Sequence, residues 1–347
     1  MNSIQNTNYV IYTENIKKDL SVTCLSDLHF SPSVKNKKLN LISSGIDKVN
    51  PSYVFISGDT VDSLNMIDND SELERLLNWF SIIASKRPII IGIGDHDQYI
   101  KTATGRKFSE PKRLIEAINS IGSSNIHFLD NSVYEDENIY VCGYTQTIDY
   151  FNYPKYNSTI FHPIPEDKER LIKELKELLG KIGTIPEDKP TFLLTHSPIY
   201  LSDSDIQLLL NAFCYYITGH THSGCVFPEL DKIWKSKEGI IAPNKEFNPN
   251  NVRNTLQNEN DKLLTNGAMT TFQYCSGIMQ LFNFLFPIYM STMHFTNNIN
   301  MKENKLSITK EYIRWVYSSF FIIKSLETIN FKTYIHPGVP CENRTHI

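Results

Sequence analysis

The sequence predicts an α/β protein in which short buried strands alternate with amphipathic helices. Runs of β-branched and aromatic residues recur along the first two thirds of the chain, and stretches with helical spacing of apolar residues separate several of them. Polar, titratable residues follow many of these runs directly, as expected where an open sheet presents a ligand site. The hydrophobic fraction of 41% and the charged fraction of 21% suit a chain that buries a core.

The expected strands share β-branched or aromatic composition and end at polar or turn-forming residues. We place them at Tyr9–Thr13, Val22–Ser26, Tyr53–Ser57, Pro88–Ile93, Ile126–Leu129, Ile139–Gly143, Thr191–Thr195, Tyr215–Thr218, Ile288–Phe295 and Leu306–Trp315. The clearest helix runs from about Glu166 to Ile182, where Leu171, Leu175 and Leu178 lie on one apolar stripe. A second helix is expected at Cys275–Phe284.

One domain is expected over residues 1–325. Residues 228–262 are polar, rich in Asn and Lys and without clear periodicity, which predicts a long excursion from the fold, with a lid as one interpretation. Residues 326–347 fit no regular element and are interpreted as a disordered C-terminal tail.

Charge and cysteine usage exclude several classes of protein. The chain of 347 residues has 34 basic and 38 acidic residues, a net charge of −4, so no broad cationic surface for nucleic acid is expected. The six cysteines contain no C-x-x-C pair, which favours a reducing compartment. Residues 1–20 lack the pattern of a signal peptide, and Gln280, Asn283 and Pro287 interrupt the most apolar stretch, 278–295.

We therefore expect a cytoplasmic protein with no nucleic-acid partner, and the sequence implies no protein partner. Met279, Phe282, Phe284 and Phe286 are interpreted as core, with weak peripheral contact to a membrane as the alternative.

Metal-capable side chains follow five of the expected strands. They are Asp27 and His29 in VTCLSDLHF, Asp59 and Asp62 in YVFISGDTVD, Asp95, His96 and Asp97 in PIIIGIGDHDQ, His196 in TFLLTHSP, and His220 with His222 in YYITGHTHSG. Each alone has an ordinary interpretation, such as a Gly-Asp turn or a hydrogen-bonded surface histidine. Bringing all of these charged and polar side chains together costs free energy unless cations compensate their charge, so the set predicts a metal centre. Imidazole and carboxylate ligands suit Mn, Fe, Co, Ni or Zn, and two-metal sites activate water for attack at phosphorus.

The blocks D-L-H, G-D-T-V-D, G-D-H-D, T-H-S-P and G-H-T-H-S-G, in this order, resemble the calcineurin-like metallophosphoesterase family. The resemblance covers residues 27–224 and implies a four-layer α/β/β/α sandwich of two mixed sheets with flanking helices. The last block is followed by a proline and a long polar stretch, and in this the sequence is similar to small bacterial membrane-associated phosphohydrolases, which include lipid-precursor pyrophosphatases.

The resemblance also implies roles for the site residues. One divalent ion is held by Asp27, His29, Asp59 and His222, and the other by Asp59, Asp95, His196 and His220, so that Asp59 bridges two ions that are Mn, Fe, Zn or similar. A hydroxide between the ions is the nucleophile. His96 protonates the leaving oxygen or stabilises the phosphoryl charge, and Asp62 matches the carboxylate that orients His96.

Asp95 departs from the family pattern, which usually has a neutral Asn at this position. Two divalent ions with Asp27, Asp59, Asp95 and a hydroxide are formally neutral, whereas an Asn ligand leaves one positive charge. We expect Asp95 to change metal preference and to favour singly charged diesters over doubly charged monoesters.

The expected activity is metal-dependent hydrolysis of a phosphodiester or pyrophosphate bond in a small molecule or lipid precursor. A weakly active or inactive scaffold of the same fold and a nuclease of the same superfamily are the alternatives. A protein phosphatase is disfavoured because Ser63 and Leu64 stand where those enzymes have Arg-Gly. Arg106 and Lys107 are interpreted as solvated surface charges, with contact to a phosphate as the alternative.

Overall fold

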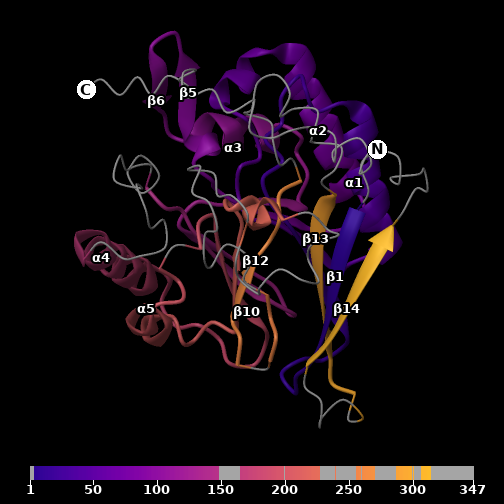
Figure 1. The fold of residues 1–347 in the computed structure, drawn as a ribbon, viewed down its shortest axis with the longest axis vertical. Helices are drawn as coiled ribbons and strands as arrows, with labels where there is room; N and C mark the ends of the chain where they lie inside the picture. Colours follow the sequence, from indigo (N-terminus) through magenta and orange to yellow (C-terminus); the bar gives the residue numbers. More distant parts are fainter. Residues whose placement is uncertain are drawn as a thin grey trace, which may run out of the picture.

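The computed structural model describes residues 4–147, 165–198, 200–226, 239, 255–258, 260–269, 287–298, 300 and 306–313. Within these ranges two mixed β-sheets pack against each other, and each outer face is covered by helices (Figure 1). The four-layer α/β/β/α sandwich that the resemblance implied is therefore confirmed.

The first sheet has seven strands in the order β14-β1-β13-β2-β3-β4-β7. Strands β2, β3, β4 and β7 run parallel, whereas β13 is antiparallel to β2 and β14 is antiparallel to β1. The bounds are β1 Ile4–Tyr12, β2 Leu20–Leu25, β3 Tyr53–Ile56, β4 Ile89–Gly92, β7 Ile126–Leu129, β13 Ile288–Thr296 and β14 Leu306–Ile313.

Three helices connect the parallel strands of this sheet and cover its outer face: α1 Asn36–Val49, α2 Asp70–Ala84 and α3 Lys112–Asn119. The sequence fixes their ends locally. The side chain of Asn69 accepts a hydrogen bond from the Glu72 amide at the start of α2. Asn50 closes α1 in the left-handed region at φ 50°.

The second sheet has five strands in the order β12-β11-β10-β9-β8, of which β9 to β12 are parallel. The bounds are β8 Ser132–Glu135, β9 Tyr140–Tyr144, β10 Thr191–Thr195, β11 Tyr215–Thr218 and β12 Leu263–Thr265. Helices α4, Pro165–Ile182, and α5, Ser204–Leu209, cover its outer face, on the side of the molecule away from α1 and α2 (Figure 1).

A third, two-stranded sheet stands apart from the sandwich as a hairpin (Figure 1). It consists of β5, Tyr99–Thr102, and β6, Gly105–Phe108, and follows the short 3₁₀ helix η2, His96–Gln98. Two more 3₁₀ helices, η1 at Leu64–Asp68 and η4 at His222–Cys225, lie in loops at the strand ends.

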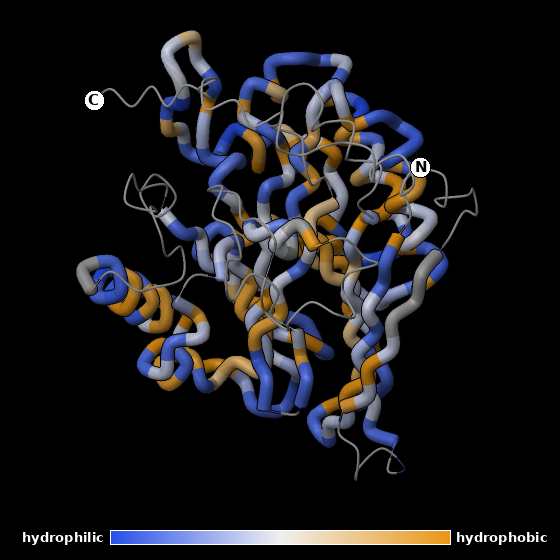
Figure 2. Tube along the Cα trace, viewed as in Figure 1, coloured by the Kyte–Doolittle hydropathy of each residue, from blue (hydrophilic) through white to orange (hydrophobic). Residues whose placement is uncertain are grey.

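Apolar residues fill the space between the two sheets and the space beneath each helical layer. Phe55 of the first sheet meets Phe192 of the second edge to face, with ring centroids 5.1 Å apart. In α4 the buried positions Leu171, Leu175 and Leu178 face the second sheet, and the alternation of hydrophobic and hydrophilic segments along this helix is visible in Figure 2.

Most expected elements are confirmed within a few residues, and Ile126–Leu129, Thr191–Thr195 and Tyr215–Thr218 have the expected bounds. The expected strand at Tyr9–Thr13 begins five residues earlier, at Ile4, because the segment before Tyr9 pairs with β13 despite its polar sequence.

Some expectations lie outside the described residues. They are the helix at Cys275–Phe284, the Met and Phe residues near it, most of 228–262 and the tail at 326–347. Among the described helices, none is long and apolar enough to span a membrane. The single-domain organisation over 1–325 stays a prediction.

Candidate metal centre

The predicted site residues follow the carboxyl ends of five parallel strands, three in one sheet and two in the other. Asp27 and His29 come after β2, Asp59 and Asp62 after β3, and Asp95 with His96 after β4; His196 follows β10, and His220 with His222 follow β11. Because both sheets direct these ends to the same edge of the sandwich, side chains far apart in sequence meet there.

The backbone at the site is held in an uncommon conformation. Five of the predicted ligands have positive φ angles: Asp27 at 55°, His29 at 46°, Asp59 at 52°, His220 at 66° and His222 at 50°. Only a few per cent of residues other than glycine adopt this left-handed region, and each such residue costs about 1–3 kcal/mol. Strain of this kind gathers where a site requires particular side-chain directions.

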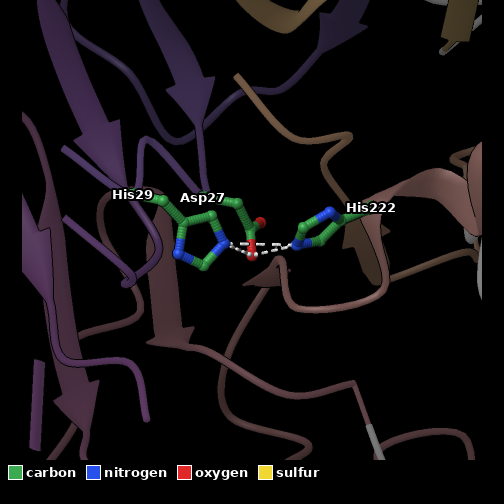
Figure 3. A group of neighbouring side chains, drawn as sticks. All are labelled: Asp27, His29 and His222. Carbon is green, nitrogen blue, oxygen red and sulfur yellow. Dashed lines mark hydrogen bonds and ion pairs between the residues drawn. The ribbon is translucent and has the colours of Figure 1, made fainter. Parts of the chain in front are cut away.

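One group of side chains consists of Asp27, His29 and His222 (Figure 3). The two imidazole Nε2 atoms are 3.3 Å apart, and Asp27 Oδ1 lies 3.3 Å from Nε2 of His222 and 3.8 Å from Nε2 of His29. One nitrogen of each ring therefore faces the same carboxylate oxygen, and the three atoms form a compact triangle.

A second group consists of Asp95, His196 and His220. Asp95 Oδ1 lies 3.4 Å from His196 Nε2 and 3.5 Å from His220 Nδ1. Asp59 lies between the two groups, because its Oδ2 is 3.1 Å from His196 Nε2 and 3.5 Å from His29 Nε2. Within each group, the ligand atoms lie within 4.8 Å of one another.

Contacts behind the ligands fix their orientation. His196 Nδ1 lies 2.7 Å from the Ser57 carbonyl oxygen, which can only accept, so Nδ1 carries a proton and Nε2 is the nitrogen that faces the site. The free carboxylate oxygens are used as well: Asp27 Oδ2 accepts from the His220 amide at 3.1 Å, and Asp59 Oδ1 accepts from the His96 amide at 2.9 Å. Site residues that follow different strands are thus hydrogen-bonded to one another.

The structure corrects the atom through which Asp62 meets His96. The imidazole Nδ1 donates to the backbone carbonyl of Asp62 at 2.8 Å, whereas the Asp62 carboxylate pairs with Lys101. The hydroxyl of Tyr99 also lies 2.6 Å from this Nδ1. Nε2 of His96 faces the cluster, 3.8 Å from Asp95 Oδ2.

The cluster concentrates buried negative charge. Burial and the neighbouring Asp95 charge raise the pKa of Asp59 well above its usual value. Burial raises the pKa of Asp27, but His222 and His196 outweigh it and hold that pKa at about 2. Burial lowers the pKa of His29 well below its usual value, which keeps its ring neutral and able to bind a metal.

Cations fit this donor set. Asp27 Oδ1 and Asp95 Oδ1 are buried and accept no hydrogen bond from the described residues, although each faces imidazole nitrogens. Such oxygens are costly unless a positive charge binds them, and carboxylate with imidazole is the chemistry that binds transition metals.

The site residues differ in their access to solvent. Asp27, His29, Asp59 and His196 are at most 1% exposed, whereas Asp95, His96 and His222 are 5%, 6% and 7% exposed. The His220 side chain is 17% exposed. These four residues are the most solvent-accessible members of the cluster.

The sequence did not identify the supporting roles of two buried residues. Asp97 accepts hydrogen bonds from the amides of Gly94 at 3.0 Å and Val61 at 3.1 Å, which ties two ligand loops together. Gln146 accepts from the Ser197 amide at 2.7 Å and so ties the end of β9 to the loop of His196. Position within a few residues of a strand end was the one available signal for both.

Comparisons with known proteins place the chain among phosphoesterases. The family model described as calcineurin-like phosphoesterase matches residues 20–224. The chain is 26% identical over 223 residues to a Danio rerio protein named "Transmembrane protein with metallophosphoesterase domain", which covers 60% of this chain and 41% of that protein. It is 24% identical over 236 residues to an uncharacterized metallophosphoesterase of Campylobacter jejuni, which covers 65% of this chain and 50% of that protein.

The matched part thus spans half or less of the length of these relatives. A solved structure described as a dimetal phosphatase from Danio rerio aligns with a TM-score of 0.38 and 11% identity, covering 72% of this chain and 88% of that chain.

Proposed function

Because the chain belongs to the calcineurin-like phosphoesterase family, and is by that membership a phosphoester hydrolase, we propose that it cleaves a phosphodiester or pyrophosphate bond with two divalent metal ions. The supporting observation is the convergence of seven carboxylate and imidazole side chains from five strand ends, five of them held at positive φ. Packing alone gives no reason to maintain that arrangement.

We propose that Asp27, His29 and His222 hold one ion, that Asp95, His196 and His220 hold the other, and that Asp59 contributes to both. Ions such as Mn, Fe or Zn bound there supply activated water and positive charge for the phosphoryl oxygens. The ligands themselves contribute pre-set geometry, since their second atoms are bound to backbone groups of neighbouring loops.

His96 is proposed to donate a proton to the leaving oxygen, or a hydrogen bond to the phosphoryl group, from Nε2. Its Nδ1 is held by the Asp62 carbonyl, so the ring cannot turn its other nitrogen to the substrate without losing that bond. Burial lowers the pKa of His96 to about 4, so we expect Nε2 to gain its proton together with an anionic substrate, whose charge opposes the shift.

The substrate is proposed to be a small molecule or a lipid precursor, and the site to lie in a single domain over residues 1–325. Two relatives are named transmembrane proteins, which keeps membrane association of this chain open to test. A cytoplasmic location is our proposal, with weak peripheral membrane contact as the alternative.

A substrate panel tests the function. Chromogenic monoesters, diesters and nucleotide pyrophosphates are offered to the purified protein with Mn, Zn, Fe or Mg in turn, beside single-stranded DNA as a nuclease substrate. We expect metal-dependent turnover of a diester or pyrophosphate.

Two variants serve as matched controls. His196→Asn removes a proposed ligand, whereas His127→Asn changes a histidine that packs on Tyr134, with ring centroids 4.4 Å apart, outside the cluster. Activity should disappear in the first and persist in the second. No turnover with any metal favours the inactive scaffold, and turnover of DNA alone favours the nuclease.

A further inference from the structure

The β5–β6 hairpin presents one basic face beside the candidate metal centre. β5 begins directly after η2, and the strands pair through Tyr99 with Phe108 and Lys101 with Arg106. Because side chains alternate between the two sides of a strand, these four residues share one side and Lys107 lies on the other.

Two cations of this face are held by acids of the site. Lys101 pairs with the Asp62 carboxylate, and Arg106 Nη1 lies 4.0 Å from Asp95 Oδ2. Like charges directly opposite each other destabilise a hairpin, so Lys101 and Arg106 would repel if they stood alone. The acidic partners offset that repulsion and set both cations against the site.

The Arg106 guanidinium is oriented but only weakly paired. Its central carbon lies 4.4 Å from the centroid of the Tyr99 ring, a cation–π contact that fixes the plane of the group. Its 4.0 Å separation from Asp95 is longer than the roughly 2.7–2.9 Å of a charge-assisted hydrogen bond. The side chain is 51% exposed, so part of its N–H fork faces solvent.

Arg106 lies beside two of the more exposed members of the cluster. Asp95, its ion-pair partner, and His96, the neighbour of Asp95, are among the site residues with measurable exposure. With two divalent ions and a hydroxide bound, the three carboxylates would leave the site formally neutral, so a guanidinium beside it would supply the net positive charge that attracts a phosphate. The planar fork also matches two oxygens of one phosphate.

We propose that Arg106 is a specificity-determining residue whose guanidinium binds the phosphate oxygens of the substrate at the mouth of the site. This inference rests on the proposed function, because it assigns a binding role at the same site. Lys107, the next residue, is assigned no such role because it faces the other side of the hairpin.

Phosphate binding tests the inference without relying on turnover. Inorganic phosphate is titrated calorimetrically into the Mn-loaded protein and into variants whose folding is checked by circular dichroism. Arg106→Ala should weaken binding roughly tenfold, because it removes a hydrogen bond to a charged group. Arg106→Lys should lose part of the affinity, since it keeps the charge but not the fork.

Lys107→Ala, a matched change on the same strand, should stay within about twofold of the unsubstituted protein. Equal effects of Arg106→Ala and Lys107→Ala would overturn the inference, as would an unsubstituted protein that binds no phosphate. An Arg106→Ala effect that disappears in an Asp95→Asn background would also overturn it, because Arg106 would then act only by screening Asp95.

Kinetics separate this inference from the proposed function. With the substrate that the panel selects, Arg106→Ala should raise KM more than it lowers kcat. If phosphate binding depends on Arg106 but no phosphoester is cleaved, the binding role stands and the proposed function fails.

Discussion

Gly94 makes the position of Asp59 testable without changing any proposed ligand. A Cβ atom at Gly94 would lie 2.2 Å from Asp59 Oδ1 and 2.4 Å from the Asp59 backbone nitrogen. Ordinary contacts begin near 3.4 Å, so Gly94→Ala requires the Asp59 backbone to move by about 1 Å. Overpacking of this kind costs about 1–3 kcal/mol of stability, and a displacement of about 1 Å at a reacting site costs on the order of 100-fold in rate.

Calorimetric titration of Mn²⁺ into metal-free protein measures the effect on the site, and urea unfolding measures the effect on stability. We expect Gly94→Ala to weaken Mn²⁺ binding at least about tenfold, because Asp59 is proposed to contact both ions. The control is Gly180→Ala: Gly180 lies in α4 with nothing within 4 Å of an added Cβ, and the change should stabilise the helix by up to about 1 kcal/mol. If Gly94→Ala binds Mn²⁺ with unchanged affinity and stoichiometry, the assignment of Asp59 is wrong.

Three further substitutions probe different parts of the structure. His96→Gln should lower kcat about 10²–10⁴-fold with unchanged metal content, because it removes a proton donor but no ligand, and loss of the metals would show instead that His96 is structural. Asp95→Asn should add one positive charge and raise monoester turnover relative to diester turnover; unchanged ratios and metal affinities would refute the charge argument. Asp136→Asn should destabilise the protein by about 1–2 kcal/mol at pH 7, because the carboxylate accepts hydrogen bonds from Tyr53 and Tyr134. Burial raises the pKa of Asp136, but these bonds outweigh it and lower that pKa below 3.8. The destabilisation measured by urea unfolding should therefore be full at neutral pH and shrink as the pH falls below about 4. A destabilisation that does not change with pH would show that ionisation of Asp136 is not involved.

The sequence predicted the strand ends of the site well for a physical reason. Buried parallel strands need continuous apolar runs, and a run such as Thr191–Thr195 stops at His196, where the strand ends and the site begins. The site residues therefore follow the segments whose secondary structure the sequence predicts most clearly.

Other features depend on partners that are remote in sequence. Asn6 is 1% exposed within β1, and its polar neighbours gave no strand pattern; the Thr292 hydroxyl, from β13, donates to its side chain at 3.0 Å. The Asn6 amide donates to Asn8 two residues on, but the partner of its buried side-chain oxygen, Thr292, is not contained in the local sequence.

The hairpin and the contact of Asp62 were missed for the same reason. Nothing in the spacing of Arg106 indicates that it lies over the Tyr99 ring, since the hairpin turn decides which residues pair. Likewise, the carboxylate of Asp62 attracted attention, whereas its backbone carbonyl makes the contact with His96. Backbone acceptors have no side-chain signature in a sequence.

Anomalous X-ray scattering from crystals loaded with Mn²⁺ tests the two-ion centre most directly. We expect two peaks, one among Asp27, His29 and His222 and one among Asp95, His196 and His220, with Asp59 between them. Crystals that show no peak at these side chains after loading, or peaks only elsewhere on the surface, would contradict the proposed centre.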